Sequence, residues 1–335
     1  MSFSQALASN DWLLADGATG TNLFAMGLEA GDAPELWNTD KPETIKKLYQ
    51  LSVDAGSDVF LTNSFGGTAA RLKLHNAQNR VGELNRVAAE LARDVADHAD
   101  RKVYVAGSVG PTGELLKPVG PLTHEAAVEM FHEQAQALKD GGVDVLWVET
   151  ISSAEEFRAA AEAFARVDMP WCGTMSFDTA GRTMMGVTAP MLSQMIRELD
   201  HKPLAYGANC GTGASDLVRT LQGFDTTHSA VISKGNAGIP KYVDGHICYD
   251  GTPDLMADYA VMAYNSGATL IGGCCGTRPE HLVKMRAALE ATSGRKAPPS
   301  LTEIEAALGS FSSKNDGTEA DAPAPRARRT RRRAS

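Results

Sequence analysis

The sequence predicts an α/β protein, a single (β/α)8 TIM-type barrel followed by a disordered C-terminal tail. Short apolar runs alternate with Ala- and Glu-rich segments of helical character from the N-terminus to about Gly294. Such alternation is typical of βαβ units and a parallel sheet, and eight units in roughly 280 residues match a closed barrel. A doubly wound open sheet is the alternative, but Asp16–Thr21, after the first apolar run, lacks the G-x-G-x-x-G spacing of a dinucleotide-binding turn.

Each expected strand is an apolar run bounded by small or polar residues, and each expected helix has apolar residues at helical spacing. In chain order the strands are Leu13–Gly17, Val59–Phe65, Val103–Gly110, Val145–Ile151, Trp171–Phe177, Ala205–Cys210, Ala230–Gly235 and Leu270–Cys275. The helices are Glu43–Ala55, Arg80–His98, His124–Lys139, Ala154–Arg166, Met191–Asp200, Ser215–Gln222, Pro253–Ser266 and Pro279–Ala291. Pro42, Pro253 and Pro279 stand at expected helix starts, where a first-turn proline is tolerated.

The regular pattern stops after residue 294, which divides the chain into three parts. Residues 1–294 form the expected barrel, and residues 295–309 form a connector with a short helix at Leu301–Leu308. Residues 310–335 are rich in Ser, Asp, Gly, Ala and Pro and end in an arginine run, a composition typical of a disordered tail. This run is interpreted as solvated, with contacts to RNA or to an acidic surface as the alternative.

Charge and composition describe a protein with an acidic body. The net charge is −9, and the last ten residues hold six arginines and no acids, so subtracting their +6 leaves −15 for the rest of the chain. This balance argues against nucleic-acid binding by the folded domain. No apolar run reaches 18 residues, and Met1–Gln5 lacks the features of a secretion signal, so no membrane segment is expected. We therefore expect a cytoplasmic protein whose thiols stay reduced.

The pair Cys274-Cys275 is the most informative chemical feature. Adjacent cysteines have Cα atoms about 3.8 Å apart, too close for an unstrained disulfide, so they are better metal ligands, or else two small buried residues at a strand end. Cys210 ends another expected strand, and in a barrel the carboxyl ends of all strands meet at one mouth. Three thiolates without an obvious fourth ligand suit a zinc ion that keeps one position open. Cys172 and Cys248 are interpreted as structural, which leaves too few cysteines for an iron–sulfur cluster.

Acidic and amide side chains stand at the same strand ends. Asp16 closes the first expected strand and Glu149 the fourth, where a buried acid is costly unless it is paired. Each carboxylate is a candidate anchor for a substrate ammonium, with a salt bridge to a barrel lysine or arginine as the alternative for Glu149. Asn209 is a candidate contact for a substrate carboxylate or for the backbone, and the amides of the turn that begins at Gly17 are further donors.

Seven short motifs, in the same order and within residues 13–285, resemble the homocysteine S-methyltransferase family. They are Asp16–Thr21, Leu61–Phe65, Gly110–Gly113, Glu149-Thr150, Gly207–Cys210, Gly235–Gly238 and Gly272–Thr277. Members of this family are barrel enzymes that form methionine by methylating zinc-bound homocysteine. The zinc ligands implied by the resemblance are Cys210, Cys274 and Cys275. The implied substrate contacts are Asp16, Gly17, Ser64, Glu149 and Asn209, with Asp16 and Glu149 as catalytic carboxylates.

The implied mechanism follows from zinc chemistry. Coordination deprotonates the homocysteine thiol without a separate strong base, and the pocket aligns the sulfur with the methyl group of the donor. A free thiol is only a few per cent thiolate at neutral pH, so metal activation alone contributes a factor of tens.

Members of the family differ in their methyl donor, which is betaine or another onium compound, S-methylmethionine or S-adenosylmethionine, or methylcobalamin. Gly110–Gly113 and Glu149-Thr150 resemble the homocysteine module of cobalamin-dependent methionine synthase. In animal betaine enzymes a tyrosine follows the matching glutamate, and a second tyrosine stands at the position of Gly66. This chain has Thr150 and Gly66 at these positions, so it lacks both tyrosines. Against the cobalamin donor, a single barrel has no room for folate or cobalamin domains.

A quaternary ammonium donor needs only an aromatic cage. The candidate cage residues are Trp37, Phe65, Trp147, Phe177 and Tyr206. We therefore expect glycine betaine as the donor. The alternative is the homocysteine-activating subunit of a split methionine synthase, which takes its methyl group from methylcobalamin on a separate corrinoid protein. A phosphate-binding barrel enzyme is a more distant alternative, because Gly235–Gly238 and Gly272-Gly273 fall on the last two strands.

Overall fold

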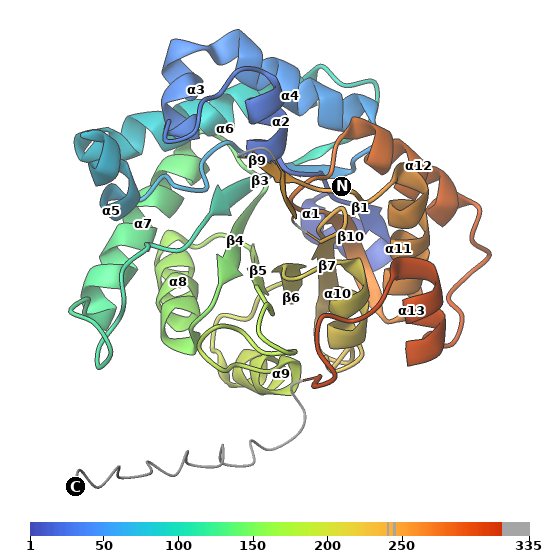
Figure 1. Cartoon of the computed structure of the whole chain (residues 1–335). Helices are drawn as coiled ribbons and strands as arrows, with labels where there is room; N and C mark the ends of the chain where they lie inside the picture. The colour runs from blue at the N-terminus through green and yellow to red at the C-terminus, as the bar shows by residue number, and fades with distance from the viewer. Residues whose placement is uncertain (240, 244–245, 317–335) are drawn as a thin grey trace, which may run out of the picture.

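The computed structural model describes residues 1–239, 241–243 and 246–316. Eight parallel strands form a ring, and the helices form an outer layer around it (Figure 1). The strands are β1 (Leu13–Leu14), β2 (Val59–Leu61), β3 (Tyr104–Val109), β4 (Val145–Ile151), β5 (Trp171–Met175), β6 (Ala205–Cys210), β7 (Ala230–Gly235) and β10 (Ala268–Gly273). Their order is β1-β10-β7-β6-β5-β4-β3-β2, and Ala15 pairs with Val59 to close the ring. The predicted (β/α)8 barrel is confirmed.

The eight barrel helices predicted from the sequence are present, each within two residues of its expected ends. They are α4 (Pro42–Asp54), α6 (Val81–Asp97), α7 (His124–Asp140), α8 (Ala154–Val167), α9 (Ala189–Glu198), α10 (Ala214–Leu221), α11 (Pro253–Asn265) and α12 (Pro279–Glu290). The side chains of Thr123, Ser153 and Thr252 each accept a backbone N–H from the first turn of the helix that follows. Pro42, Pro253 and Pro279 occupy first-turn positions, as predicted.

Several short elements were not predicted. They are α1 (Phe3–Ser9), α2 (Thr19–Ala25), α3 (Trp37–Asp40), α5 (Ala69–Leu72) and an antiparallel hairpin of β8 (Lys241–Val243) and β9 (His246–Cys248). Cys248 therefore ends a strand of this hairpin rather than lying in a loop. The strand β10 ends at Gly273, so Cys274 and Cys275 lie just beyond it and not within it, because the chain folds back over the mouth there.

The interior of the barrel is filled by side chains from alternate strand positions. They are Leu13, Ala15, Val59, Leu61, Tyr104, Ala106, Val145, Trp147, Cys172, Ala205, Ile232 and Leu270. Phe3, Ala6 and Leu7 of α1 pack against this cluster, and the rings of Phe3 and Tyr104 lie 5.5 Å apart. The helix α1 therefore closes the amino-terminal end of the barrel.

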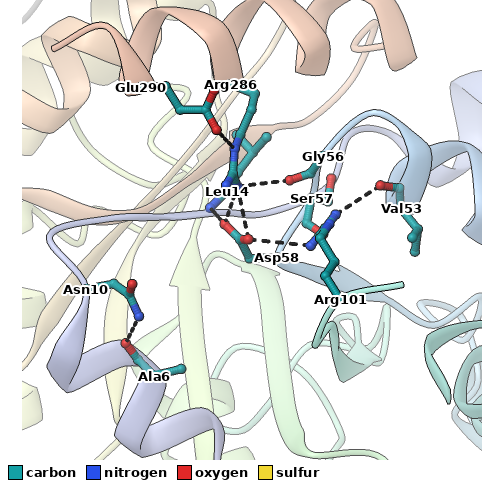
Figure 2. Close-up of polar contacts among 10 residues, drawn as sticks. All are labelled: Ala6, Asn10, Leu14, Val53, Gly56, Ser57, Asp58, Arg101, Arg286 and Glu290. Atoms are coloured by element: carbon teal, nitrogen blue, oxygen red, sulfur yellow. Dashed lines mark hydrogen bonds and ion pairs between the residues drawn. The ribbon is translucent and has the colours of Figure 1, made fainter. Parts of the chain in front are cut away.

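A charged network holds the β1–β2 seam at the amino-terminal end of the strands (Figure 2). One carboxylate oxygen of Asp58 accepts the backbone N–H of Leu14 at 2.8 Å, and the backbone N–H of Asp58 donates to the Leu14 carbonyl at 2.7 Å. Arg286 of α12 reaches both oxygens of Asp58, at 3.0 and 2.9 Å. Arg101 lies 3.5 Å from the same carboxylate. The side chain of Asp58 thus joins β1, β2 and the outer helical layer.

Replacing Asp58 with alanine is expected to lower the free energy of unfolding by about 3 kcal/mol, because it removes the partly buried carboxylate that accepts from both the Leu14 backbone N–H and Arg286, while Arg286 keeps its contacts with Glu290 and the Gly56 carbonyl. Urea unfolding of the full chain measures the effect. The matched control is Asp254→Ala, which removes an exposed ion pair to Lys284 and should cost less than about 0.5 kcal/mol. Equal effects of the two substitutions would contradict a role of Asp58 in closing the barrel.

The C-terminal segment begins on the barrel surface. The predicted helix Leu301–Leu308 is present as α13. The backbone N–H of Ser312 donates to Asp216 of α10 at 3.0 Å, and the guanidinium of Arg219 lies 4.2 Å from the centre of the Phe311 ring. Residues 310–316, the start of the predicted disordered tail, therefore contact α10, whereas residues 317–335 with their arginine run lie outside the described residues. Within the described part of the chain, no helix is long and apolar enough to cross a membrane.

Candidate metal and substrate site

Three thiols converge at the carboxyl end of the barrel. Cys210 ends β6, and Cys274 and Cys275 follow β10. Their sulfur atoms all lie within 4.8 Å of one another, with 3.7 Å between Cys210 and Cys275. Cys210 has a left-handed backbone (φ +62°), which is uncommon and strained for a residue other than glycine. A Cβ on Gly273 would lie 2.3 Å from Thr277, so only glycine allows the loop to fold back at this point.

The thiols share their protons. Hydrogen bonds from Cys210 and then Cys274 lower the pKa of Cys275, while hydrogen bonds to Cys274 and Cys275 raise the pKa of Cys210. One thiolate is therefore held by two protonated neighbours, an arrangement in which a soft cation readily takes the place of the protons. Three convergent sulfur donors that are partly open to the mouth fit zinc with one position left for a substrate.

Tyr249 is a neighbour of the thiols that sequence reasoning missed. It follows β9, and its hydroxyl hydrogen-bonds the side chain of Cys275. Burial raises the pKa of Tyr249, and the negative charge of Cys275 raises it further, so the hydroxyl stays protonated at neutral pH and donates. The hairpin that carries Tyr249 is too short to be recognised from sequence periodicity.

Glu149 lies on β4 beside the thiols. The hydroxyl of Ser108 on β3 donates to its Oε1 at 2.5 Å. Burial raises the pKa of Glu149 to about 7, although the positive charge of Lys234 and the Ser108 hydrogen bond act in the opposite direction. Lys234 alone does not offset the cost of burying this carboxylate, so a second cation beside it, such as the ammonium of an amino acid, would be bound favourably.

Asn209 fixes the end of β4. Its Oδ1 accepts the backbone N–H of Thr150 at 2.9 Å, and its Nδ2 donates to the Thr150 hydroxyl at 2.7 Å. Thr150 has a left-handed backbone (φ +61°), a conformation that is costly for a β-branched residue. The Asn209 amide also lies 3.7 Å from the sulfur of Cys274. Asn209 thus joins the turn after Glu149 to the thiol cluster.

Asp16 lies at the end of β1, but it already has an internal cation. Its Oδ1 accepts a hydrogen bond from the ammonium of Lys234 at 2.6 Å, and its Oδ2 accepts the backbone N–H of Leu61 at 2.8 Å. Lys234 comes from β7 and lies 5.5 Å from the centre of the Trp147 ring inside the barrel. Sequence reasoning missed Lys234, although a single charged residue near the end of an apolar strand was the available signal.

Ser64 and Gly17 occupy supporting positions. The Ser64 hydroxyl is fully buried and donates to the Ser108 carbonyl at 2.7 Å, so it links the chain after β2 to β3 below Glu149. A Cβ on Gly17 would lie 2.9 Å from the Thr277 carbonyl oxygen, which brings the turn after β1 against the loop of Cys274 and Cys275. The structure therefore gathers the three thiols, Glu149 and Asn209 at the mouth. The metal ligands and the substrate contacts predicted for Asp16, Gly17, Ser64, Glu149 and Asn209 all stay predictions.

Comparison with known proteins agrees with this site. The family profile described as homocysteine S-methyltransferase matches residues 13–289. The chain is 29% identical over 294 residues to the methionine synthase of Mycobacterium tuberculosis, a match that covers 83% of this chain and 24% of that protein. The chain thus spans about a quarter of the length of this relative.

Solved structures give the same result. The metallated form of the homocysteine methyltransferase MmuM from Escherichia coli superposes with a TM-score of 0.69 at 25% identity, covering 84% of this chain and 98% of that one. Its oxidised form gives a TM-score of 0.67 at 26% identity, with 84% and 97% covered. Because the family profile covers nearly the whole barrel, the chain belongs to the homocysteine S-methyltransferase family.

Proposed function

We propose that the protein is a zinc-dependent homocysteine S-methyltransferase that forms methionine. The observation that carries the proposal is the convergence of Cys210, Cys274 and Cys275 beside a carboxylate at the barrel mouth. Three thiolates hold a zinc ion with one open position, and a thiol substrate is a fourth sulfur ligand for that position. The metallated form of the related Escherichia coli enzyme supports the presence of a metal in this site.

The residues around the thiols have separable tasks in this proposal. Bound zinc supplies the charge that keeps the homocysteine sulfur deprotonated at neutral pH. Glu149 binds the substrate ammonium, which orients the amino acid. Asn209 and Tyr249 contact Cys274 and Cys275 respectively, and such donors orient metal-binding side chains and moderate their charge.

The structure offers little support for a cage around betaine. Trp37, Trp147, Phe177 and Tyr206 are buried in the core, and only Phe65 is partly exposed. A side chain at position 66 is excluded as well, because a Cβ on Gly66 would lie 2.9 Å from Oε1 of Glu35. A small quaternary ammonium therefore has few aromatic faces to contact among the described residues.

The alternative donor, a methylated corrinoid protein, is favoured by the surface around the mouth. Seven exposed apolar residues lie on the segments that follow β1, β2, β3, β5 and β7, where the strands open to the mouth. They are Phe24, Leu74, Leu115, Val119, Met184, Met185 and Ile239. All seven therefore lie on the loops and helices at the carboxyl end of the strands, and an apolar rim there would suit a surface that binds another protein. We therefore propose delivery of the methyl group by a partner protein as the second candidate function, on the basis of these exposed apolar residues.

Methionine formation by the zinc-loaded protein separates the donors. With homocysteine, we expect turnover with a methylated corrinoid protein, slow turnover with free methylcobalamin, and none above background with glycine betaine or S-methylmethionine. Methionine is measured by mass spectrometry, with the Cys275→Ala variant as the background control. Turnover with betaine alone would contradict the partner-protein proposal, and the absence of turnover with every donor would contradict the methyltransferase proposal itself.

A further inference from the structure

We propose that Lys234 is a positioning residue that commits Asp16 to an internal ion pair and leaves Glu149 as the carboxylate that binds the homocysteine ammonium. This inference rests on the proposed function and assigns separate tasks to two acids that the sequence predicted to act together. It also gives a role to a buried lysine that the zinc chemistry does not use.

Asp16 is already fully paired within the protein. Both of its oxygens accept hydrogen bonds from the protein, one from Lys234 at 2.6 Å and one from the Leu61 backbone at 2.8 Å. Only 6% of the Asp16 side chain and 3% of the Lys234 side chain are exposed. A substrate ammonium at Asp16 would have to displace a buried lysine or share its oxygen with it, and two adjacent cations oppose each other.

Glu149 differs from Asp16 in both respects. Within the described part of the chain, the hydroxyl of Ser108 bonds its Oε1 and no hydrogen bond reaches its Oε2. Residue 149 is only partly buried, next to the thiols that would hold the substrate sulfur. A carboxylate with one uncommitted oxygen on the open side of the barrel can accept an ammonium without losing an existing partner.

The charge balance of the pocket supports the same assignment. Asp16 and Glu149 carry two negative charges when ionised, and Lys234 carries one positive charge, which leaves a net charge of −1 outside the thiol cluster. One substrate ammonium neutralises the uncompensated carboxylate, and the substrate's own carboxylate brings a further negative charge that must be bound elsewhere. The groups that face the Lys234 ammonium are the carboxyl groups of Asp16 and Glu149, the sulfur of Cys274 and the Trp147 ring, so two acids, a sulfur atom and an aromatic face surround the lysine.

The test uses the zinc-loaded full chain and the variants Lys234→Met and Asp16→Asn/Lys234→Met. In Lys234→Met, an unpaired Asp16 remains beside Glu149, and we expect homocysteine affinity to change at least tenfold, measured by calorimetry on folded, zinc-containing protein. The double variant Asp16→Asn/Lys234→Met removes both charges. Its dissociation constant for homocysteine should return towards the wild-type value and differ at least tenfold from that of Lys234→Met. The control Lys284→Met removes an exposed lysine of α12 and should leave affinity unchanged.

The outcomes distinguish positioning from a merely structural role. If Lys234 only stabilised the fold, Lys234→Met would lower the melting temperature and leave the homocysteine affinity of the folded protein unchanged, which would overturn the inference. A double variant that keeps zinc but binds homocysteine no better than Glu149→Gln would identify Asp16 as the ammonium contact and also overturn it.

A crystal structure of the wild-type protein with zinc and homocysteine keeps the inference testable if the variants do not fold. We expect the substrate nitrogen within hydrogen-bond distance of Glu149 and the ion pair between Lys234 and Asp16 intact. A substrate nitrogen bonded to Asp16 would contradict the inference. Failure of the proposed function is recognised separately, because wild-type protein would then form no methionine with any donor.

Discussion

Replacing Cys275 with alanine is expected to abolish stoichiometric zinc binding and to reduce methionine formation at least about 1,000-fold. Cys275 lies 3.7 Å from Cys210 in the thiol cluster, so its loss leaves two protein sulfurs where three are needed to hold the ion with one open position. Loss of a residue that merely orients a metal ligand already costs about 10–100-fold in affinity, so loss of a ligand should exceed that range. Zinc content after dialysis and homocysteine-dependent turnover measure both effects.

The matched control for this variant is Cys172→Ala. Cys172 is a free cysteine of β5, buried in the barrel interior away from the mouth. Its replacement removes one sulfur atom from the core and should lower stability modestly, while zinc content stays at one ion per chain. Retained stoichiometric zinc in Cys275→Ala, with the same chelator resistance as wild type, would contradict the three-thiolate site.

Replacing Glu149 with glutamine is expected to weaken homocysteine binding about thirtyfold while zinc content stays unchanged. The substitution removes a charge but keeps the shape, so the loss corresponds to about 2 kcal/mol for one partner of a hydrogen-bonded charge pair. Calorimetry on zinc-loaded protein measures it. The control is Glu155→Gln, an exposed acid of α8 whose replacement should have no effect on affinity. An unchanged affinity in Glu149→Gln would show that another group binds the ammonium.

The pKa of Glu149 gives this binding a pH dependence with a defined sign. In the free protein, burial raises this pKa to about 7, so the carboxyl is largely protonated below that pH. A substrate ammonium favours the ionised form, and binding should therefore strengthen as the pH rises towards 7 and become independent of Glu149 above it. The homocysteine thiol also titrates, so the difference in slope between wild type and Glu149→Gln isolates the carboxyl.

For stability, the same raised pKa acts in the opposite direction. The folded protein holds the Glu149 proton more tightly than the unfolded chain, whose value is about 4.5. The contribution of this group to stability is therefore fully present below pH 4.5 and is lost as the pH rises through 7. The substrate site thus becomes competent to bind an ammonium over the pH range in which it is least favourable for folding.

Much of the fold and part of the site were predictable because local patterns encode them. Strand and helix periodicities alternate without interruption, which predicts the barrel, and a barrel brings strand ends such as Cys210 and Cys274 together without further information. The element ends were less predictable. The regular strand β1 ends at Leu14, and beyond it only Ala15 continues the sheet, by a single pairing with Val59 of β2, so the predicted strand Leu13–Gly17 is longer than the observed one.

The partners within the site were not predictable. Asp16 and Lys234 are separated by 218 residues, and no local pattern specifies that they form an ion pair. The hydroxyl of Ser108 and the phenol of Tyr249 are likewise brought to Glu149 and Cys275 by the arrangement of distant segments. The sequence therefore identified which residues stand at the mouth, and the structure determined which of them are already occupied.

The seam held by Asp58 has a consequence for how this protein tolerates change. Asp58 and its arginine partners lie at one end of the barrel and the thiols at the other, so substitutions at Asp58 and at the thiols share no contacts and their costs should add. The loops around the thiols can then vary in sequence while the contacts of Asp58 stabilise the other end of the barrel. A barrel arranged in this way can adapt to a new donor by accumulating changes in its loops, because its integrity does not depend on them.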